Sequence, residues 1–194
     1  MHKKMVIATR NKGKLTEYEH MLQPLGFEIF SLFDFSVPDI PETGETFFEN
    51  ARIKALAMRQ HTRELILADD SGLVVDALGG APGVHSKRYS EAGTDDANNE
   101  KLLQELAVHH DRRARFIAVI VLVLPSGEIR AFNGELPGYI HTECVGELGF
   151  GYDPLFLPVG RTETLAELGP AVKNRLSHRA RALRQLLDYL QAES

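Results

Sequence analysis

Residues 114–133, ARFIAVIVLVLPSGEIRAFN, hold the longest apolar run of the chain, followed by a turn and a second, shorter run. An apolar run rich in β-branched residues predicts a buried strand over 114–124. Pro125-Ser126-Gly127 has the composition of a hairpin turn, so we expect the chain to return as a strand over 129–133. The stretch therefore predicts a sheet that contains an antiparallel hairpin.

On either side of this hairpin, apolar runs and helical patterns alternate along the chain. Thr46 followed by Glu49 is a capping-box pattern for the start of a helix. The mixture predicts an α/β fold whose sheet contains both crossovers and hairpins. A length of 194 residues fits one domain, so we treat 1–194 as a single domain. Further strands are expected at 5–8, 28–32, 65–68, 73–75 and 139–145, and helices at 14–22, 47–58, 98–107 and 179–191.

Composition and charge narrow the class of protein. The net charge is −5, whereas a nucleic-acid binder usually has a basic surface, so we expect no nucleic-acid partner. The one cysteine, Cys144, excludes a disulfide scaffold and fits a reducing compartment. The longest apolar run is too short to span a bilayer, and the first residues lack the pattern of a signal peptide. We therefore expect a cytoplasmic protein with no membrane partner.

Residues 9–14, Thr-Arg-Asn-Lys-Gly-Lys, lie between the first expected strand and the first expected helix. The N-terminus of a helix carries unpaired N–H groups and partial positive charge, which suits phosphate. Lys14 adds a full charge, and Gly13 would let the backbone approach a phosphate oxygen closely. The spacing is not that of a Walker A loop. A basic helix start on the surface is the alternative, and position alone leaves both open.

Two adjacent carboxylates, Asp69 and Asp70, follow an apolar strand. Like charges repel and are costly to desolvate, so the pair is unusual as structural filler. Side chains alternate along an extended backbone, so the two carboxylates cannot easily share one role. Hard oxygen ligands favour Mg²⁺, and Glu42, in a loop with glycine, is a candidate second ligand. The alternative is an exposed turn, since Asp-Ser-Gly is also turn chemistry.

Residues 149–154, Gly-Phe-Gly-Tyr-Asp-Pro, place an aromatic ring between two glycines. Such a ring can stack on a nucleobase, and Asp153 could accept from a base N–H. Taken alone, the stretch favours a core aromatic beside a turn. Further along, His178 and Arg179 would project as donors from the start of the last helix, near Lys173. A capped surface helix with incidental charges is the alternative there.

These motifs, in this order, resemble the inosine/xanthosine triphosphate pyrophosphatase family, and the resemblance spans nearly the whole chain. The matching strings are ATRN (8–11) with Lys14, ETG (42–44), TF (46–47), ENA (49–51), Lys54, ADDSGL (68–73), GGAPG (79–83), RYS (88–90), GFGYDP (149–154), Lys173 and SHR (177–179).

The resemblance implies an elongated mixed β-sheet flanked by helices, two lobes with a central cleft, and a homodimer. It implies hydrolysis of ITP, dITP and XTP between the α- and β-phosphates. The products would be the nucleoside monophosphate and pyrophosphate, and the reaction would cleanse the nucleotide pool. The implied cofactor is Mg²⁺.

The resemblance also implies roles for individual residues. Glu42 and Asp70 would be the Mg²⁺ ligands, Asp70 would also activate water, and Asp69 would support it. A 6-keto oxygen would accept from His178 or Arg179, whereas adenine offers a donor at that position. The implied substrate contacts are Thr9, Asn11, Lys14, Lys54, Ser71 and Lys173 for the triphosphate, and Phe150, Asp153, His178 and Arg179 for the base.

The chain departs from the family pattern at Arg10, His85 and Leu148, where relatives commonly carry Gly, Tyr and Gly. These positions bear on fine selectivity, since none is a proposed catalytic group. Three other hypotheses remain. One is a pyrophosphatase for modified pyrimidine nucleotides, one is a nucleotide-binding sensor without catalysis, and one is an enzyme with Cys144 as nucleophile. A lone cysteine is more often a small apolar residue than a nucleophile.

Overall fold

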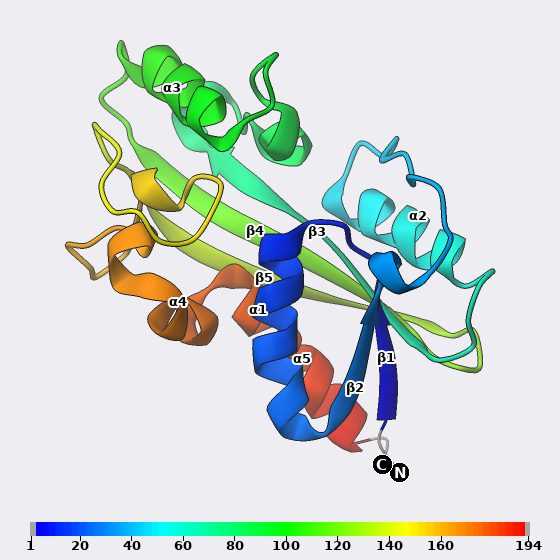
Figure 1. Cartoon of the computed structure of the whole chain (residues 1–194). Coiled ribbons are helices and arrows are strands. Elements are labelled where there is room, and N and C mark those ends of the chain that lie inside the picture. Colours follow the sequence, from blue (N-terminus) through cyan, green and yellow to red (C-terminus); the bar gives the residue numbers. More distant parts are fainter. Residues whose placement is uncertain (1–2, 193–194) are drawn as a thin grey trace. The chain divides into compact units, whose positions relative to one another are not determined.

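The computed structural model describes residues 3–192, and its strands form a six-stranded mixed sheet in the order β2-β1-β3-β4-β5-β6 (Figure 1). β1 pairs in parallel with β2 and β3, and β5 pairs antiparallel with β6. The predicted α/β fold with a mixed sheet flanked by helices is therefore confirmed. The strands are β1 (Lys3–Ile7), β2 (Phe27–Ser31), β3 (Leu65–Val75), β4 (Arg113–Val123), β5 (Ile129–Ile140) and β6 (Phe156–Pro158), and the helices are α1 (Lys12–Leu22), α2 (Phe47–Met58), α3 (Asp95–Leu106), α4 (Leu165–Leu176) and α5 (His178–Ala192).

The chain divides into two compact units, and each is described by itself below. Unit 1 comprises residues 1–70, 118–134 and 179–194, and unit 2 comprises residues 71–117 and 135–178. The first residues of the chain were predicted to lack a signal-peptide pattern. Two of them, Met1 and His2, lie outside the described residues. Whether 1–194 acts as a single domain stays a prediction.

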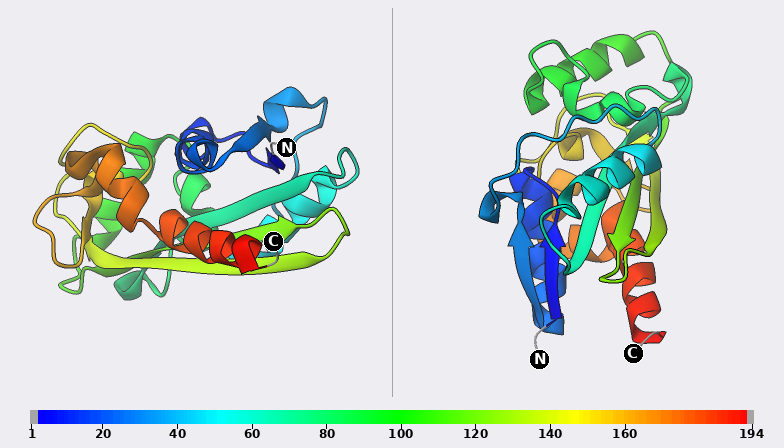
Figure 2. Two further views of the ribbon diagram at one scale, coloured as in Figure 1. Left: turned by 90° about the horizontal axis from the view of Figure 1, so that it is seen from below. Right: turned by 90° about the vertical axis from the view of Figure 1, so that its right-hand side faces the viewer.

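The segment of β3 in unit 1 buries both of its faces, and successive residues take opposite faces as the pleat requires. Leu67 packs with Tyr18 of α1 and Leu183 of α5 in one apolar core, while Ile66 and Ala68 pack with α2 in another. Figure 2 shows α1 and α5 on one side of the strands of unit 1 and α2 on the other. The face that a β3 side chain occupies therefore decides which helices it meets.

Unit 2 has its own apolar core. It forms between the strand segments of this unit and helices α3 and α4, and it includes Leu102, Phe116 and Phe156. Thr94 caps α3 by accepting from the N–H of Ala97, which fixes the helix start at Asp95. That start is earlier than the predicted 98.

Two predictions about strands need correction, and one helix was missed. β3 is one strand of 11 residues, whereas the sequence predicted two short strands with a break at the polar residues 69–72. The separate strands predicted at 129–133 and 139–145 are one strand, β5, which ends at Ile140. Helix α4 was missed, since Gly169 and Pro170 interrupt its pattern and Gly169 has a φ of 76°. The capping box of Thr164 and Glu167 was the available signal for α4.

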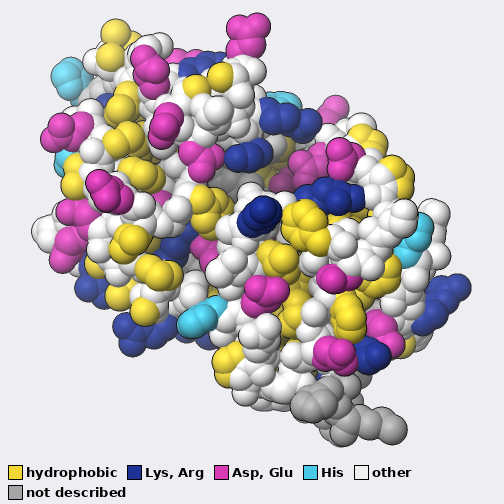
Figure 3. All heavy atoms as spheres, viewed as in Figure 1, with side chains coloured by type: hydrophobic (Ala, Val, Ile, Leu, Met, Phe, Trp, Pro, Cys, Tyr) yellow, Lys and Arg dark blue, Asp and Glu magenta, His cyan; other side chains and the backbone are white. Residues whose placement is uncertain are grey.

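Charged side chains of both signs share the surface. On the face shown in Figure 3, lysines and arginines are interspersed with aspartates and glutamates, so that face carries no continuous basic patch. In the part of the chain that the structure covers, every helix is too short or too polar to cross a bilayer.

Candidate active site

Helix α1 begins at a capped turn that carries three predicted phosphate ligands. The side chain of Asn11 accepts from the N–H of Lys14 at 3.1 Å, and the hydroxyl of Thr9 accepts from the N–H of Asn11 at 3.1 Å. The first turn of α1 contains no acidic residue. These contacts shape the turn. The partial positive charge at the N-terminus of the helix is not neutralised by a carboxylate of the same turn.

Asp69 lies on the β3 face that meets α1 and α5, and it is almost completely buried. Its Oδ2 lies 3.0 Å from Nζ of Lys14 and 3.4 Å from Nε of Arg179. Burial by itself would raise the pKa of Asp69, but Lys14, Arg179 and Lys54 outweigh it and hold that pKa at about 2. Arg179 also donates to Oε2 of Glu17 at 2.8 Å. Asp69 is therefore ionised at neutral pH, where it anchors two cations.

Asp70 has different surroundings. Its Oδ2 accepts from Nδ2 of Asn50 on α2 at 3.1 Å. Burial raises the pKa of Asp70 more than the nearby Lys14 and Lys54 lower it. Asp70 is therefore a stronger base than an ordinary aspartate, and its environment separates it from Asp69.

The loop that carries Glu42 is tied to the same helix. Asn50 uses its Oδ1 to accept from the N–H of Gly44 at 2.8 Å. A Cβ on Gly44 would lie 2.5 Å from Cβ of Glu49, so a side chain there would push the loop away. Nζ of Lys54 donates to Oε1 of Glu42 at 2.5 Å and to the backbone oxygen of Asp69 at 2.6 Å. Asn50 thus links the Glu42 loop to Asp70, and Lys54 links it to β3.

The donor chemistry of Glu42 and Asp70 fits Mg²⁺. Both supply carboxylate oxygens, and both are tied to α2. Within residues 3–192, no group of three or more His, Cys, Asp and Glu side chains is arranged to hold a metal. Mg²⁺ needs only one or two carboxylates, because phosphate oxygens and water complete its shell, whereas zinc takes three or four protein side chains.

In unit 2, the aromatic loop is built around Phe150. Oδ2 of Asp153 accepts from the N–H of Phe150 at 3.0 Å and from Nζ of Lys173 at 2.6 Å, and both charged side chains are buried. The Lys173 ammonium lies 4.1 Å from the centroid of the Phe150 ring. Gly149 is required here, since a Cβ would lie 2.1 Å from Oδ2 of Asp153. The loop therefore presents a ring whose backbone and one face are fixed by a buried ion pair.

The structure brings most of the predicted residues into two sets. In unit 1, Lys14, Glu42, Lys54, Asp69, Asp70 and Arg179 form one network, with Thr9 and Asn11 at the adjoining helix start. In unit 2, Phe150, Asp153 and Lys173 form the other.

Two other predicted residues, His178 and Ser71, have different surroundings from these two sets. The ring of His178 is buried and stacks on Phe116, with centroids 4.8 Å apart. Ser71 follows Asp70 in β3 and is partly buried.

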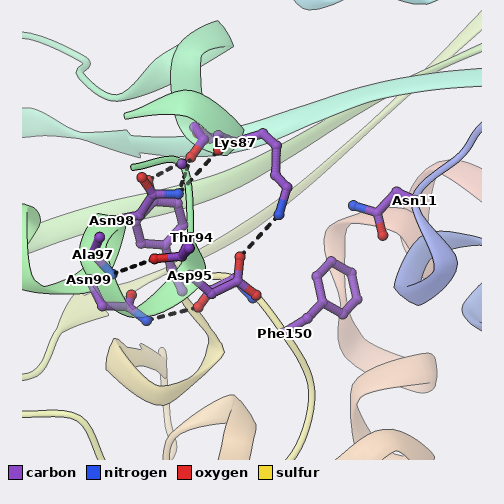
Figure 4. Close-up of polar contacts among 12 residues, drawn as sticks. Asn11, Lys87, Thr94, Asp95, Ala97, Asn98, Asn99 and Phe150 are labelled. Carbon is purple, nitrogen blue, oxygen red and sulfur yellow. Dashed lines mark hydrogen bonds and ion pairs between the residues drawn. The ribbon is translucent and has the colours of Figure 1, made fainter. Parts of the chain in front are cut away.

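Sequence reasoning missed several residues of these sets. Asn50 lies four residues before Lys54, on the same side of α2, and that spacing was a usable signal. Glu17 lies three residues after Lys14 on α1, but nothing local shows that its partner is Arg179. Asp95 and Asn99 of α3 contact the aromatic loop, as Figure 4 shows beside Phe150.

Cys144 does not fit a nucleophile. It lies exposed after β5, and partial desolvation, followed by the nearby Asp96, raises the pKa of its thiol. A raised thiol pKa lowers the population of the reactive thiolate.

The family to which the chain belongs follows from its match to a family model. A model described as the Ham1 family matches residues 5–189. The chain belongs to the Ham1 family. This confirms the resemblance drawn from the motifs.

Two of the relatives with solved structures, and one known from its sequence, are similar to this chain over almost their whole length. A dITP/XTP pyrophosphatase of Bacillus licheniformis is 47% identical over 188 residues, covering 95% of this chain and 96% of the relative. The structure of the Staphylococcus aureus Ham1 protein superposes with a TM-score of 0.88 at 39% identity and covers 99% and 100% of the two chains. A nucleoside-triphosphatase/dITP/XTP pyrophosphatase of Mycobacterium abscessus gives a TM-score of 0.76 at 43% identity, covering 96% and 99%.

We expect Asp69→Asn to lower the free energy of unfolding by about 3–5 kcal/mol at pH 7, because Lys14 and Arg179 would lose a buried counter-charge. Urea unfolding measures this. The pKa of Asp69 is lowered from 3.8 to about 2, so its contribution is present above pH 3.8 and fades as the pH falls towards 2. The gap between the two proteins should narrow over that range.

The control for this prediction is Asp76→Asn, which breaks a surface ion pair with Arg115 at 2.9 Å. Exposed pairs contribute less than about 1 kcal/mol. If Asp69→Asn were as stable as Asp76→Asn at pH 7, the anchoring role of Asp69 would be wrong.

Proposed function

We propose that the protein hydrolyses non-standard purine nucleoside triphosphates, namely ITP, dITP and XTP, to the monophosphate and pyrophosphate. The protein is a nucleoside triphosphate pyrophosphatase that removes these nucleotides from the pool. The observation that carries the proposal is the division between two adjacent carboxylates. One, Asp69, is held ionised by cations, and the other, Asp70, has a raised pKa.

The charges of the unit 1 network argue for a metal cofactor. The network holds three cations, Lys14, Lys54 and Arg179, and four carboxylates, Glu17, Glu42, Asp69 and Asp70. A triphosphate adds further negative charge, so its binding requires additional positive charge. Glu42 and Asp70 would hold Mg²⁺, which when bound neutralises phosphate oxygens and makes water easier to deprotonate.

The protein's own groups then supply position and proton transfer. Lys14 and Lys54 bind phosphate oxygens, together with the N–H groups at the start of α1. Asp70 orients the attacking water and accepts its proton, and its raised pKa makes it the better base of the two aspartates. Asp69 keeps Lys14 and Arg179 in place throughout.

Base binding is assigned to unit 2. Phe150 stacks on the purine, and Lys173 already lies over one face of the ring, so we place the base on the other face. Reading of the 6-keto oxygen by His178 and Arg179 stays a prediction, and Arg179 would have to share its donors with Glu17 and Asp69. Homodimer formation and a cytoplasmic location remain part of the proposal on family grounds.

A substrate panel tests the proposed function. With Mg²⁺ present, ITP, dITP and XTP should be hydrolysed with one pyrophosphate released per monophosphate, and far faster than GTP, ATP or dUTP. Pyrophosphate and orthophosphate are measured separately, and chelation of the metal should stop the reaction until Mg²⁺ is restored. Stepwise release of orthophosphate would overturn the proposal, and so would turnover of dUTP at the rate of ITP.

We expect Asp70→Asn to lower kcat for ITP by about 10²- to 10⁴-fold, the range that general-base catalysis contributes. Asparagine can still accept from Asn50, but it cannot take a proton from water and is a poorer ligand for Mg²⁺. Steady-state pyrophosphate release measures the loss, with Asp76→Asn as a control of matched chemistry. A kcat near that of the unaltered protein, in a folded Asp70→Asn variant, would remove Asp70 from the mechanism.

A further inference from the structure

We propose that Asp95 and Asn99 of helix α3 are positioning residues for the base-stacking ring. Asp95 holds the peptide that joins Phe150 to Gly151, and Asn99 holds the next peptide, so together they fix the direction in which the ring points. The inference rests on the proposed function in one respect, which is that Phe150 is the ring on which the purine stacks.

The backbone on both sides of Phe150 is held by carboxylates. The N–H of Phe150 donates to Oδ2 of Asp153 at 3.0 Å, and the N–H of Gly151 donates to Oδ2 of Asp95 at 2.7 Å. The carbonyl of Gly151 accepts from Nδ2 of Asn99 at 3.0 Å. Because the peptides before and after the Phe150 Cα are both anchored, the direction of its Cα–Cβ bond is fixed as well.

This loop needs anchors from outside itself. Gly149 and Gly151 flank the ring with φ angles of 84° and 64°, in the left-handed region. Glycine reaches that region without strain, but it is also the residue with the most backbone freedom to lose. Without an external hold, the segment 149–151 would sample many directions of the ring, and a stacking site must be ordered before the base arrives.

The start of α3 is suited to this task. Asp95 is the first residue of the helix and Asn99 lies four residues later, so both project from one side. One reaches the N–H of Gly151 and the other reaches its carbonyl. Asn99 is buried, which limits its side chain to this arrangement.

Lys87 offers a control within the same cluster. Its ammonium lies 3.2 Å from Oδ1 of Asp95, the carboxylate oxygen that Gly151 does not use, and Figure 4 shows it directed at that carboxylate. Its side chain is largely exposed. Removing Lys87 therefore deletes the ion pair and leaves the hydrogen bond to the loop in place, whereas removing the Asp95 carboxylate deletes both.

A double-mutant cycle between α3 and the ring tests the proposal. We expect Asp95→Ala to lower kcat/KM for ITP and dITP about tenfold or more, as expected for loss of a hydrogen bond to a charged acceptor, and by the same factor for each purine. Asn99→Ala should act in the same direction. Asp95→Asn should recover much of the loss, since its amide oxygen can still accept from Gly151, and Lys87→Met should stay near the unaltered protein.

The cycle separates positioning from general destabilisation. If α3 acts through the ring, Asp95→Ala added to Phe150→Ala should cause little further loss in kcat/KM, although Tm falls in both backgrounds. Additive losses, or a Lys87→Met variant as impaired as Asp95→Ala, would overturn this inference alone. No loss in Phe150→Ala would overturn both the stacking assignment and this inference, whereas pyrophosphate release from ITP would still stand as the test of the reaction.

Discussion

The chemistry of unit 1 depends on the alternation of side chains along β3. Leu67 and Asp69 face α1 and α5, while Ile66, Ala68 and Asp70 face α2. Two carboxylates that are neighbours in sequence therefore meet different helices and different charges. Asp69 receives Lys14 and Arg179 and stays ionised, and Asp70 receives a neutral amide and keeps a raised pKa. A slip of one residue in the register of β3 would exchange the two roles.

A second principle recurs in both units, namely that ion pairs and amide hydrogen bonds hold backbone segments which contain glycine. In unit 1, Lys54 and Asn50 tie the loop that carries Glu42 and Gly44 to the strand. In unit 2, Asp153 with Lys173, and Asp95 with Asn99, hold the loop around Phe150. Glycine gives these loops the required shape, and the side-chain contacts supply the order that glycine lacks. Ordered groups of this kind are what electrostatic catalysis and base stacking require.

Local patterns in the sequence predicted what is local in the structure. The apolar run before Pro125 predicted β4, and the capping box of Thr46 and Glu49 predicted the start of α2, which the structure confirms. The unbroken β3 was missed because the run 69–71 is polar and looks like a turn. The partners of the charged residues were also out of reach. Arg179 meets Asp69 across 110 positions and Glu17 across 162, and Gly151 meets Asp95 across 56, so only the fold reveals these contacts.

The most direct test of this account is a site-resolved titration of the two aspartates. Carbon-13 NMR of the side-chain carboxyls in the metal-free protein, assigned with Asp69→Asn and Asp70→Asn, gives the pKa of each group. We expect Asp69 to titrate at about 2 and Asp70 to titrate above the ordinary value of 3.8. Titration of both groups together near 3.8, or of Asp70 below Asp69, would contradict the division of roles between them.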